Sequence, residues 1–123
     1  MTRKVLIVDD EVELLGSLSE AFQDEGYEVV TAVNGNDALR KLAHVGRPCV
    51  MILDLAMPEM SGSEVFARMR ADPKLADIPV LISTSDPSRS PEGLPVIRKP
   101  INLSRMLAAV QRLFESERAP GRW

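Results

Sequence analysis

The chain has 123 residues, the size of one ordinary domain, and its 45% hydrophobic content is enough to form a core. Its small net charge of −3 gives no bulk electrostatic case for direct binding to nucleic acid or to an anionic membrane. Because the single cysteine, Cys49, excludes an internal disulfide and no apolar run approaches the roughly 20 residues of a membrane span, we expect a cytoplasmic protein without membrane attachment.

The first half of the chain alternates between short apolar runs and helical patterns. The apolar runs predict buried parallel strands over residues 5–8, 27–32 and 49–53. Between them, apolar residues near helical spacing predict helices over residues 11–25 and 34–45. Gly26 is a natural stop for the first helix, and Asn34 or Asn36 is the expected cap of the second.

The second half continues this alternation less regularly. It predicts a helix over residues 63–70 and strands over residues 78–83 and 96–98. A last helix follows, with Asn102 as its cap and apolar residues as far as Phe114. The segment "ESERAPGRW" from Glu115 loses the pattern and is expected to fray. We therefore expect one domain over residues 1–116 and a disordered tail over residues 117–123.

The segment "SDPSRSPEGLPVIRKP", residues 85–100, lies where the alternation of strands and helices would place another helix. It contains Pro87, Pro91, Pro95 and Pro100, and proline removes a backbone donor and biases the preceding residue away from the helical conformation. Residues 86–95 leave no uninterrupted run for two stable turns, and Gly93 weakens what remains. We therefore expect a loop or a single turn between the fourth and fifth strands.

Strands that alternate with helices indicate an α/β fold, with a parallel sheet covered on both faces and right-handed crossovers. Five such strands favour the flavodoxin-like, doubly wound order 2-1-3-4-5. In this order the first and third strands are neighbours, and ligands bind beyond the carboxyl ends of the strands, where the strand order reverses.

Polar residues follow these strand ends. Asp9 and Asp10 end the first strand, Asp54 ends the third, Thr84 follows the fourth, and Lys99 follows the fifth. Three carboxylates that meet at one edge repel one another, and a hard divalent cation such as Mg²⁺ would relieve that repulsion. Each of these residues is common by itself at a solvated strand end; their joint occurrence carries the hypothesis.

The same residues favour a phosphoryl site. Lys99 suits a phosphate as a point cation, and the hydroxyl of Thr84 is a donor. No serine or cysteine nucleophile stands beside a base, and the only histidine, His44, ends the second helix, so the available nucleophile is a carboxylate. Asp54 is best placed, and its attack on phosphorus would give a labile acyl phosphate, which suits a transient signal.

These motifs resemble the receiver domain of two-component response regulators. "VLIVDDE" is similar to the acidic pair of the family, "LDLAMPEMSG" to its phosphoacceptor loop, "IPVLISTS" to its fourth strand with the hydroxyl residue, and "RKP" to its fifth-strand lysine and proline. The resemblance covers roughly residues 4–115. Together and in order, the motifs are highly specific.

The resemblance implies residue roles and partners. Asp10, Asp54 and the main-chain carbonyl of Ala56 would bind Mg²⁺ (or Mn²⁺) directly, with Asp9 acting mainly through water. Asp54 would be the phosphoacceptor, Thr84 and Lys99 would contact the phosphoryl oxygens, and a cis peptide bond before Pro100 would aim Lys99 at the site. The donor would be a phosphohistidine on a histidine kinase or a histidine phosphotransfer protein. Without an output domain, the chain would be a stand-alone receiver or a fragment.

The sequence departs from the family at two places. The interval from Thr84 to Lys99 is about seven residues shorter than is usual and lacks the helix that the family places there. Val96 stands where the family usually has Tyr or Phe, the aromatic partner of the Thr84 hydroxyl in signalling. These departures change the usual output surface and leave the chemical site intact.

Three other functions fit the sequence less well. A pseudo-receiver that binds a protein partner without phosphorylation would not need the intact set of site residues. An aspartyl-phosphate hydrolase would have a carboxylate two residues after the nucleophile, where this chain has Ala56. An FMN-binding flavodoxin would have a phosphate-binding loop after the first strand, where "DDEVE" would repel a phosphate.

Overall fold

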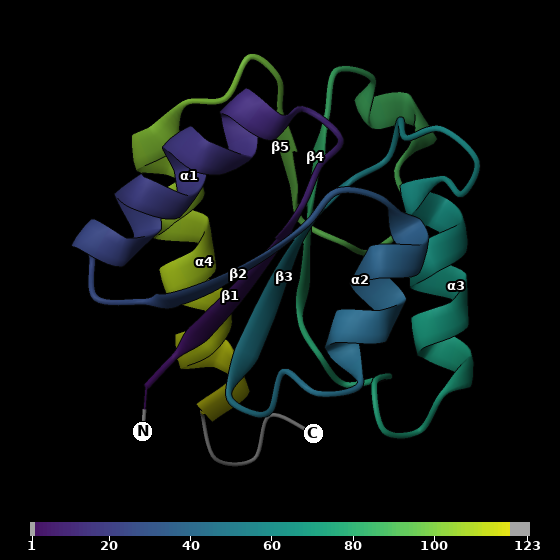
Figure 1. Ribbon diagram of the computed structural model, residues 1–123, viewed down its shortest axis with the longest axis horizontal. Coiled ribbons are helices and arrows are strands. Elements are labelled where there is room, and N and C mark those ends of the chain that lie inside the picture. The colour runs from purple at the N-terminus through teal and green to yellow at the C-terminus, as the bar shows by residue number, and fades with distance from the viewer. Residues whose placement is uncertain (1, 119–123) are drawn as a thin grey trace.

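A computed structural model, which describes residues 2–118, shows a five-stranded parallel sheet between two pairs of helices (Figure 1). The strands lie in the order β2-β1-β3-β4-β5. Their bounds are β1 Lys4–Val8, β2 Glu28–Ala32, β3 Cys49–Asp54, β4 Val80–Thr84 and β5 Val96–Arg98. The helices are α1 Val12–Asp24, α2 Gly35–Leu42, α3 Gly62–Ala71 and α4 Leu103–Arg118. The predicted flavodoxin-like fold and strand order are confirmed.

Each face of the sheet buries its own apolar cluster, because successive side chains of a strand point to opposite faces. Helices α1 and α4 cover one face and α2 and α3 cover the other (Figure 1). The α1/α4 face buries Ile7, Ile52 and Leu81 of the three inner strands against Phe22 and Phe114. None of the helices within residues 2–118 is both long enough and apolar enough to cross a bilayer.

Side-chain caps fix where three helices begin. The carboxamide oxygen of Asn34 accepts from the N–H of Asp37 at 2.8 Å, so Asn34 rather than Asn36 caps α2. The hydroxyl of Ser61 caps α3 in the same way, and Asn102 accepts from the N–H of Arg105 at 3.0 Å at the start of α4. The predicted caps at Asn34 and Asn102 are confirmed.

The last helix is longer than its apolar pattern predicts. It continues past Phe114 to Arg118, so the expected fraying from Glu115 is wrong for residues 115–118. The buried Phe114 docks the helix, good helix formers extend it, and Gln111 donates to Glu115 one turn on. The rest of the expected tail, residues 119–123, lies outside the described residues.

The fourth strand begins two residues later than expected. The N–H of Ile78 closes the preceding turn by donating to the carbonyl of Leu75 at 3.1 Å, so Ile78 belongs to that turn. The carbonyl of Pro79 accepts from the N–H of Met51 in β3 at 3.0 Å, and β4 itself begins at Val80.

The proline-rich crossing from β4 to β5 contains a single 3₁₀ turn, Pro87–Arg89, so the prediction of no normal helix in this interval is confirmed. The carboxylate of Asp86 caps this turn by accepting from the N–H of Ser88 at 3.2 Å. Leu94 and Val96 are half-buried and pack against the α2/α3 cluster. Leu94 of the loop and Val96 at the start of β5 therefore add to the apolar cluster on this face of the sheet.

Candidate functional site

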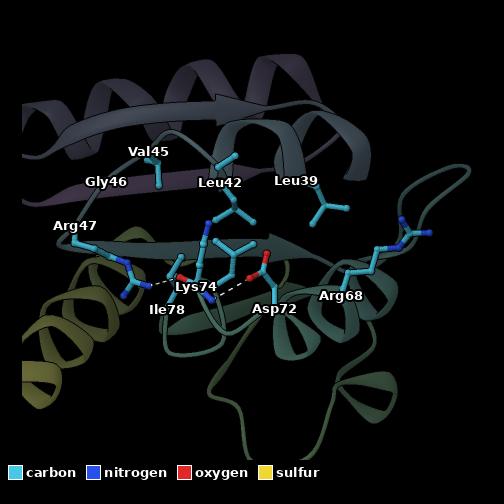
Figure 2. A pocket seen from close by; sticks show the side chains of 11 residues that line it. Leu39, Leu42, Val45, Gly46, Arg47, Arg68, Asp72, Lys74 and Ile78 are labelled. Atoms are coloured by element: carbon cyan, nitrogen blue, oxygen red, sulfur yellow. Dashed lines mark hydrogen bonds between the residues drawn. The ribbon is translucent and has the colours of Figure 1, made fainter.

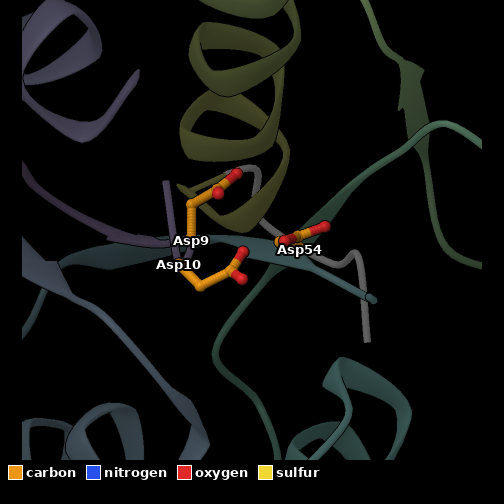
Figure 3. Close-up of side chains that lie close together, drawn as sticks. All are labelled: Asp9, Asp10 and Asp54. Carbon is orange, nitrogen blue, oxygen red and sulfur yellow. The ribbon is translucent and has the colours of Figure 1, made fainter. Parts of the chain in front are cut away.

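Three carboxylates meet at the carboxyl-terminal edge of the sheet. Residues Val8 of β1 and Leu53 of β3 are paired in register, so Asp9 and Asp54 follow at the same level. One oxygen from each of Asp9, Asp10 and Asp54 lies within 4.8 Å of the others (Figure 3). Asp9 and Asp54 are buried and Asp10 is exposed, so the cluster is open on one side.

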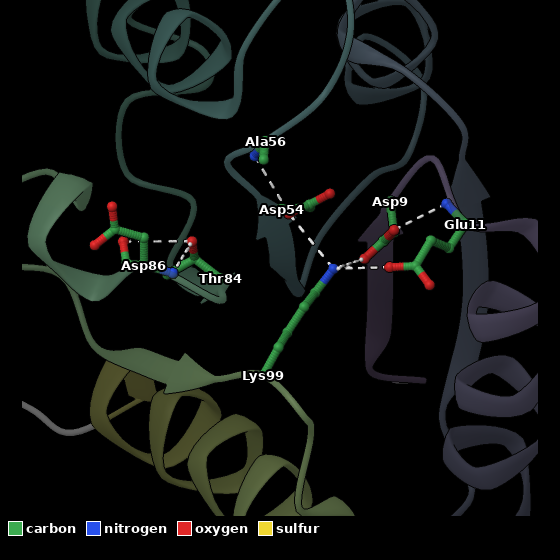
Figure 4. A network of polar contacts seen from close by, with 7 residues as sticks. All are labelled: Asp9, Glu11, Asp54, Ala56, Thr84, Asp86 and Lys99. Atoms are coloured by element: carbon green, nitrogen blue, oxygen red, sulfur yellow. Dashed lines mark hydrogen bonds and ion pairs between the residues drawn. The ribbon is translucent and has the colours of Figure 1, made fainter.

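Lys99 reaches across the edge of the sheet into this cluster (Figure 4). Its Nζ lies 2.9 Å from Oδ2 of Asp9, 3.5 Å from Oδ1 of Asp54 and 3.4 Å from Oε1 of Glu11. The peptide bond between Lys99 and Pro100 is cis, as the family resemblance implies. The N–H of Lys99 also donates to the carbonyl of Thr84 at 2.8 Å, which fixes the start of the side chain at the end of β4.

The buried carboxyl of Asp54 is a weaker acid than usual. Burial, and then the charge of Asp9, raise the pKa of Asp54 to about 6, against a smaller opposing effect of Lys99. The N–H of Ala56 donates to Oδ1 of Asp54 at 3.3 Å and also favours the ionised form. A carboxylate that is costly to ionise gains more than a solvated one when positive charge is placed beside it.

Burial acts to lower the pKa of Lys99, but its hydrogen bond to Asp9 and the charges of Asp54, Asp9 and Glu11 outweigh that effect and raise it. Lys99 therefore stays a cation across the physiological range. It partly neutralises the acidic cluster in the form of the protein that the structure describes.

The donor set fits a hard divalent cation. Carboxylate oxygens are the ligands that Mg²⁺ prefers. The three carboxylate oxygens lie within 4.8 Å of one another, so Asp9, Asp10 and Asp54 would each be able to offer one ligand to the same ion. The exposed side at Asp10 leaves room for the waters that Mg²⁺ keeps.

The hydroxyl of Thr84 lies at the same edge but is bonded to its own loop (Figure 4). Its Oγ1 accepts from the N–H of Asp86 at 3.1 Å. Beside it is a pocket of about 710 Å³ between the loop after β3 and the loop after β4, with these lining residues: Leu55, Ala56, Met57, Ser61, Ser63, Thr84, Ser85, Asp86 and Arg89. Among the described residues, the Thr84 hydroxyl is bonded to Asp86 and to none of the three carboxylates.

Close packing holds the Asp54 loop against the start of α3. The N–H of Gly62 donates to the carbonyl of Leu55 at 2.9 Å. A Cβ added at Gly62 would lie 2.2 Å from the carbonyl oxygen of Asp54. Only glycine permits this approach, which explains the glycine of the "MSG" motif from the geometry of this chain.

A second hollow, of about 520 Å³, lies between α2 and α3 (Figure 2). Its floor is apolar and its rim carries Arg47, Arg68 and Lys74. Arg47 is bonded to Asp77 at 2.6 Å and Arg68 to Glu64 at 3.0 Å, so these two cations already have carboxylate partners. None of the three clustered aspartates lines this hollow, and it is not the candidate site.

The predicted meeting of Asp9, Asp10, Asp54 and Lys99 at one edge of the sheet is observed. Thr84 lies at the same edge but is not bonded to the carboxylates. Glu11 was missed as a partner of Lys99. Its place in the acidic run "DDE" was the only indication in the sequence. The fold shows that the carboxylate of Glu11 reaches the ammonium group of Lys99. The main-chain carbonyl of Ala56 remains a prediction as a metal ligand.

Comparison with known proteins finds related sequences. The transcriptional regulatory protein PrrA of Mycobacterium tuberculosis is 35% identical over 116 residues, which are 90% of this chain and 49% of PrrA. KdpE of M. tuberculosis is 37% identical over 117 residues, which are 88% of this chain and 51% of KdpE. The chain thus spans about half the length of these curated relatives.

Solved structures give the same result. Chemotaxis response regulator CheY4 of Vibrio cholerae is 35% identical, with a TM-score of 0.80 over 92% of this chain and 99% of that one. Response regulator TrrA of Thermotoga maritima, solved in complex with Mg²⁺-BeF, is 33% identical, with a TM-score of 0.78 over the same shares. The family model described as the response regulator receiver domain matches residues 5–111, and the chain belongs to that family.

Proposed function

We propose that this chain is a phosphoacceptor receiver domain, in which the Asp54 carboxylate takes a phosphoryl group from a phosphohistidine. The donor would be a histidine kinase or a histidine phosphotransfer protein, and Asp9, Asp10, Asp54 and the carbonyl of Ala56 would hold Mg²⁺ or Mn²⁺. The observation that carries the proposal is the contact of Lys99 with Asp9 and Asp54 at the edge where the three carboxylates meet.

The chemistry follows from the placement of these groups. One oxygen of Asp54 attacks phosphorus, the P–N bond of the donor breaks, and its electron pair stays on the imidazole nitrogen. Lys99, 3.5 Å from Asp54, is placed to neutralise charge on the transferred phosphoryl oxygens. A bound divalent cation would supply further charge neutralisation between the carboxylates and the phosphoryl group. The TrrA relative, solved with Mg²⁺-BeF, supports a cation of this kind.

The same site is poorly equipped to hydrolyse its product. A hydrolase needs an acid or base that orients water beside the acyl phosphate. The side chain two residues beyond Asp54 is the methyl group of Ala56, which cannot do this. We expect slow loss of the phosphoryl group, so that the protein serves as a signalling module that promotes its own phosphorylation and dephosphorylation at most.

The output would pass through the loop between β4 and β5. The Oγ1 of Thr84 accepts from the N–H of Asp86, and the carboxylate of Asp86 caps the 3₁₀ turn, so a movement of Thr84 toward the phosphoryl group would pull Asp86 with it or break this bond. Phosphorylation should therefore loosen this turn. Hydrogen exchange of residues 85–97, with and without a phosphoryl mimic, tests this; identical protection in both states would show that the loop is not the switch.

The acceptor is tested by incubation with a small phosphodonor and Mg²⁺, followed by intact mass measurement. Wild type should gain one phosphate mass, Asp54→Asn should gain none, and Glu20→Gln, which removes an exposed carboxylate from α1, should behave as wild type. Equal phosphorylation of Asp54→Asn would refute the assignment. No phosphorylation of the wild type would favour the alternative, a pseudo-receiver that binds its partner without modification.

A further inference from the structure

The hydroxyl of Ser83 is buried and has no partner. Ser83 is 2% exposed, and its Oγ has no hydrogen-bond partner within residues 2–118. Its neighbour Thr84, by contrast, is bonded to Asp86. A buried polar group without a partner is destabilising, and such groups are uncommon in native proteins. An unpaired hydroxyl at this depth therefore requires an explanation.

The position of Ser83 in the sheet supplies one. Ser83 is the register partner of Asp54 on the adjacent strand. Alternation along β4 places Ser83 on the same face as Leu81, and alternation along β3 places Asp54 on the same face as Ile52; both apolar residues belong to the α1/α4 cluster. The serine and the aspartate are thus side-by-side neighbours on one face of the sheet.

The distances permit a bond between them. Neighbouring strands lie about 4.8 Å apart, and a serine side chain moves its Oγ among three staggered positions about χ1. Within residues 2–118, only the N–H of Ala56 and the ammonium of Lys99 lie within bonding range of the Asp54 carboxylate. Both of these groups approach Oδ1, so Oδ2 is left to accept another donor.

We infer that Ser83 is a positioning residue for the nucleophile: its hydroxyl donates to the Asp54 carboxylate and holds it in the orientation for attack on phosphorus. This inference rests on the proposed function of Asp54. A hydrogen bond from a neutral hydroxyl to a charged carboxylate is stronger than one between two neutral groups, and rotation about χ1 is the movement that would bring the Ser83 hydroxyl toward Asp54. No proton moves, since the hydroxyl keeps its hydrogen while Asp54 makes the new P–O bond.

Ser90 provides a matched control. It lies in the loop between β4 and β5, and its Oγ is likewise buried without a partner in the described part of the chain. Loss of an unpaired buried hydroxyl alone should affect both sites alike. Loss of a bond to the nucleophile should affect Ser83 alone.

The test measures the rate of Asp54 phosphorylation by phosphoramidate with Mg²⁺, together with the melting temperature of the metal-free protein. Ser83→Ala and Ser83→Cys should react roughly tenfold more slowly than wild type, the first lacking a donor and the second carrying only a weak one in a similar volume. Ser83→Thr, which keeps the hydroxyl, should restore most of the rate. Ser90→Ala should react at the wild-type rate.

Each result decides between two readings. Ser83→Ala that reacts at the wild-type rate and melts at an equal or higher temperature would overturn the inference, because the hydroxyl would then be unpaired in solution as well. Equal slowing of Ser83→Ala and Ser90→Ala would also overturn it. A wild-type protein that gains no phosphate on Asp54 would instead refute the proposed function itself.

Discussion

Replacement of Asp54 by asparagine should stabilise the metal-free protein. Burial and the charge of Asp9 raise the pKa of Asp54 from 3.8 to about 6. At 1.36 kcal/mol for each pKa unit, ionisation of this carboxyl in the folded state costs up to about 3 kcal/mol relative to the unfolded chain. Asp54→Asn removes that charge and keeps the shape of the side chain, so it should recover a large part of this free energy.

The effect has a defined pH window. Between pH 4 and 6 the folded state binds the proton that the unfolded chain has already lost, so the free energy of unfolding of the wild type falls as pH rises through this range. Below pH 3.8 the carboxyl is neutral in both states and the pKa shift contributes nothing. The advantage of Asp54→Asn should therefore appear above pH 4 and be complete near pH 7.

The assay is urea unfolding of both proteins in EDTA at intervals from pH 4 to pH 8, with Glu20→Gln as the control for loss of an exposed carboxylate. At pH 7.5 the free energy of unfolding of Asp54→Asn should exceed that of the wild type by up to about 3 kcal/mol, which corresponds to a rise of roughly 10 °C in melting temperature for a domain of this size. The control should change stability by less than about 0.5 kcal/mol. An Asp54→Asn protein that is less stable than wild type at pH 7.5, or a difference that does not depend on pH, would refute this account of the carboxylate cluster.

Three further predictions concern the metal, the loop packing and the lifetime of the phosphoryl group. Mg²⁺ at ten times its Kd should stabilise the wild type by about 1.4 kcal/mol, and Asp10→Asn should abolish this gain; a wild-type melting temperature that ignores Mg²⁺ would contradict the metal site. Gly62→Ala should lower the free energy of unfolding in urea by roughly 1–3 kcal/mol, because the new Cβ meets backbone atoms. Gly16→Ala, at an exposed position of α1 where a new Cβ meets nothing within 4 Å, should raise it by up to about 1 kcal/mol; equal effects of the two changes would contradict the packing argument. Ala56→Asn should change the rate at which phosphorylated Asp54 loses its phosphate mass, and an unchanged rate would count against a role for this position.

The fold and most of the site could be predicted from local patterns. Apolar runs and helical spacing identify the elements, and alternation of strands with helices implies a parallel sheet. In such a sheet all carboxyl ends lie at one edge, so residues that end different strands must meet whatever their separation along the chain. Asp9, Asp54 and Lys99 are brought together for this reason. The prolines similarly exclude a normal helix between β4 and β5, because proline's effect on the backbone is local.

Only the tertiary structure decided which polar groups touch. The contacts of Lys99 with Asp9 and Glu11 depend on side-chain rotamers and on packing between elements about 90 residues apart in the sequence. Sequence periodicity predicts neither of these. The continuation of α4 to Arg118 depends on the docking of Phe114, and the need for glycine at position 62 on the approach of two backbones. The same holds for Ser83: its sequence position suggests an ordinary strand residue, and its burial beside Asp54 without a partner exists only once β3 and β4 are in register.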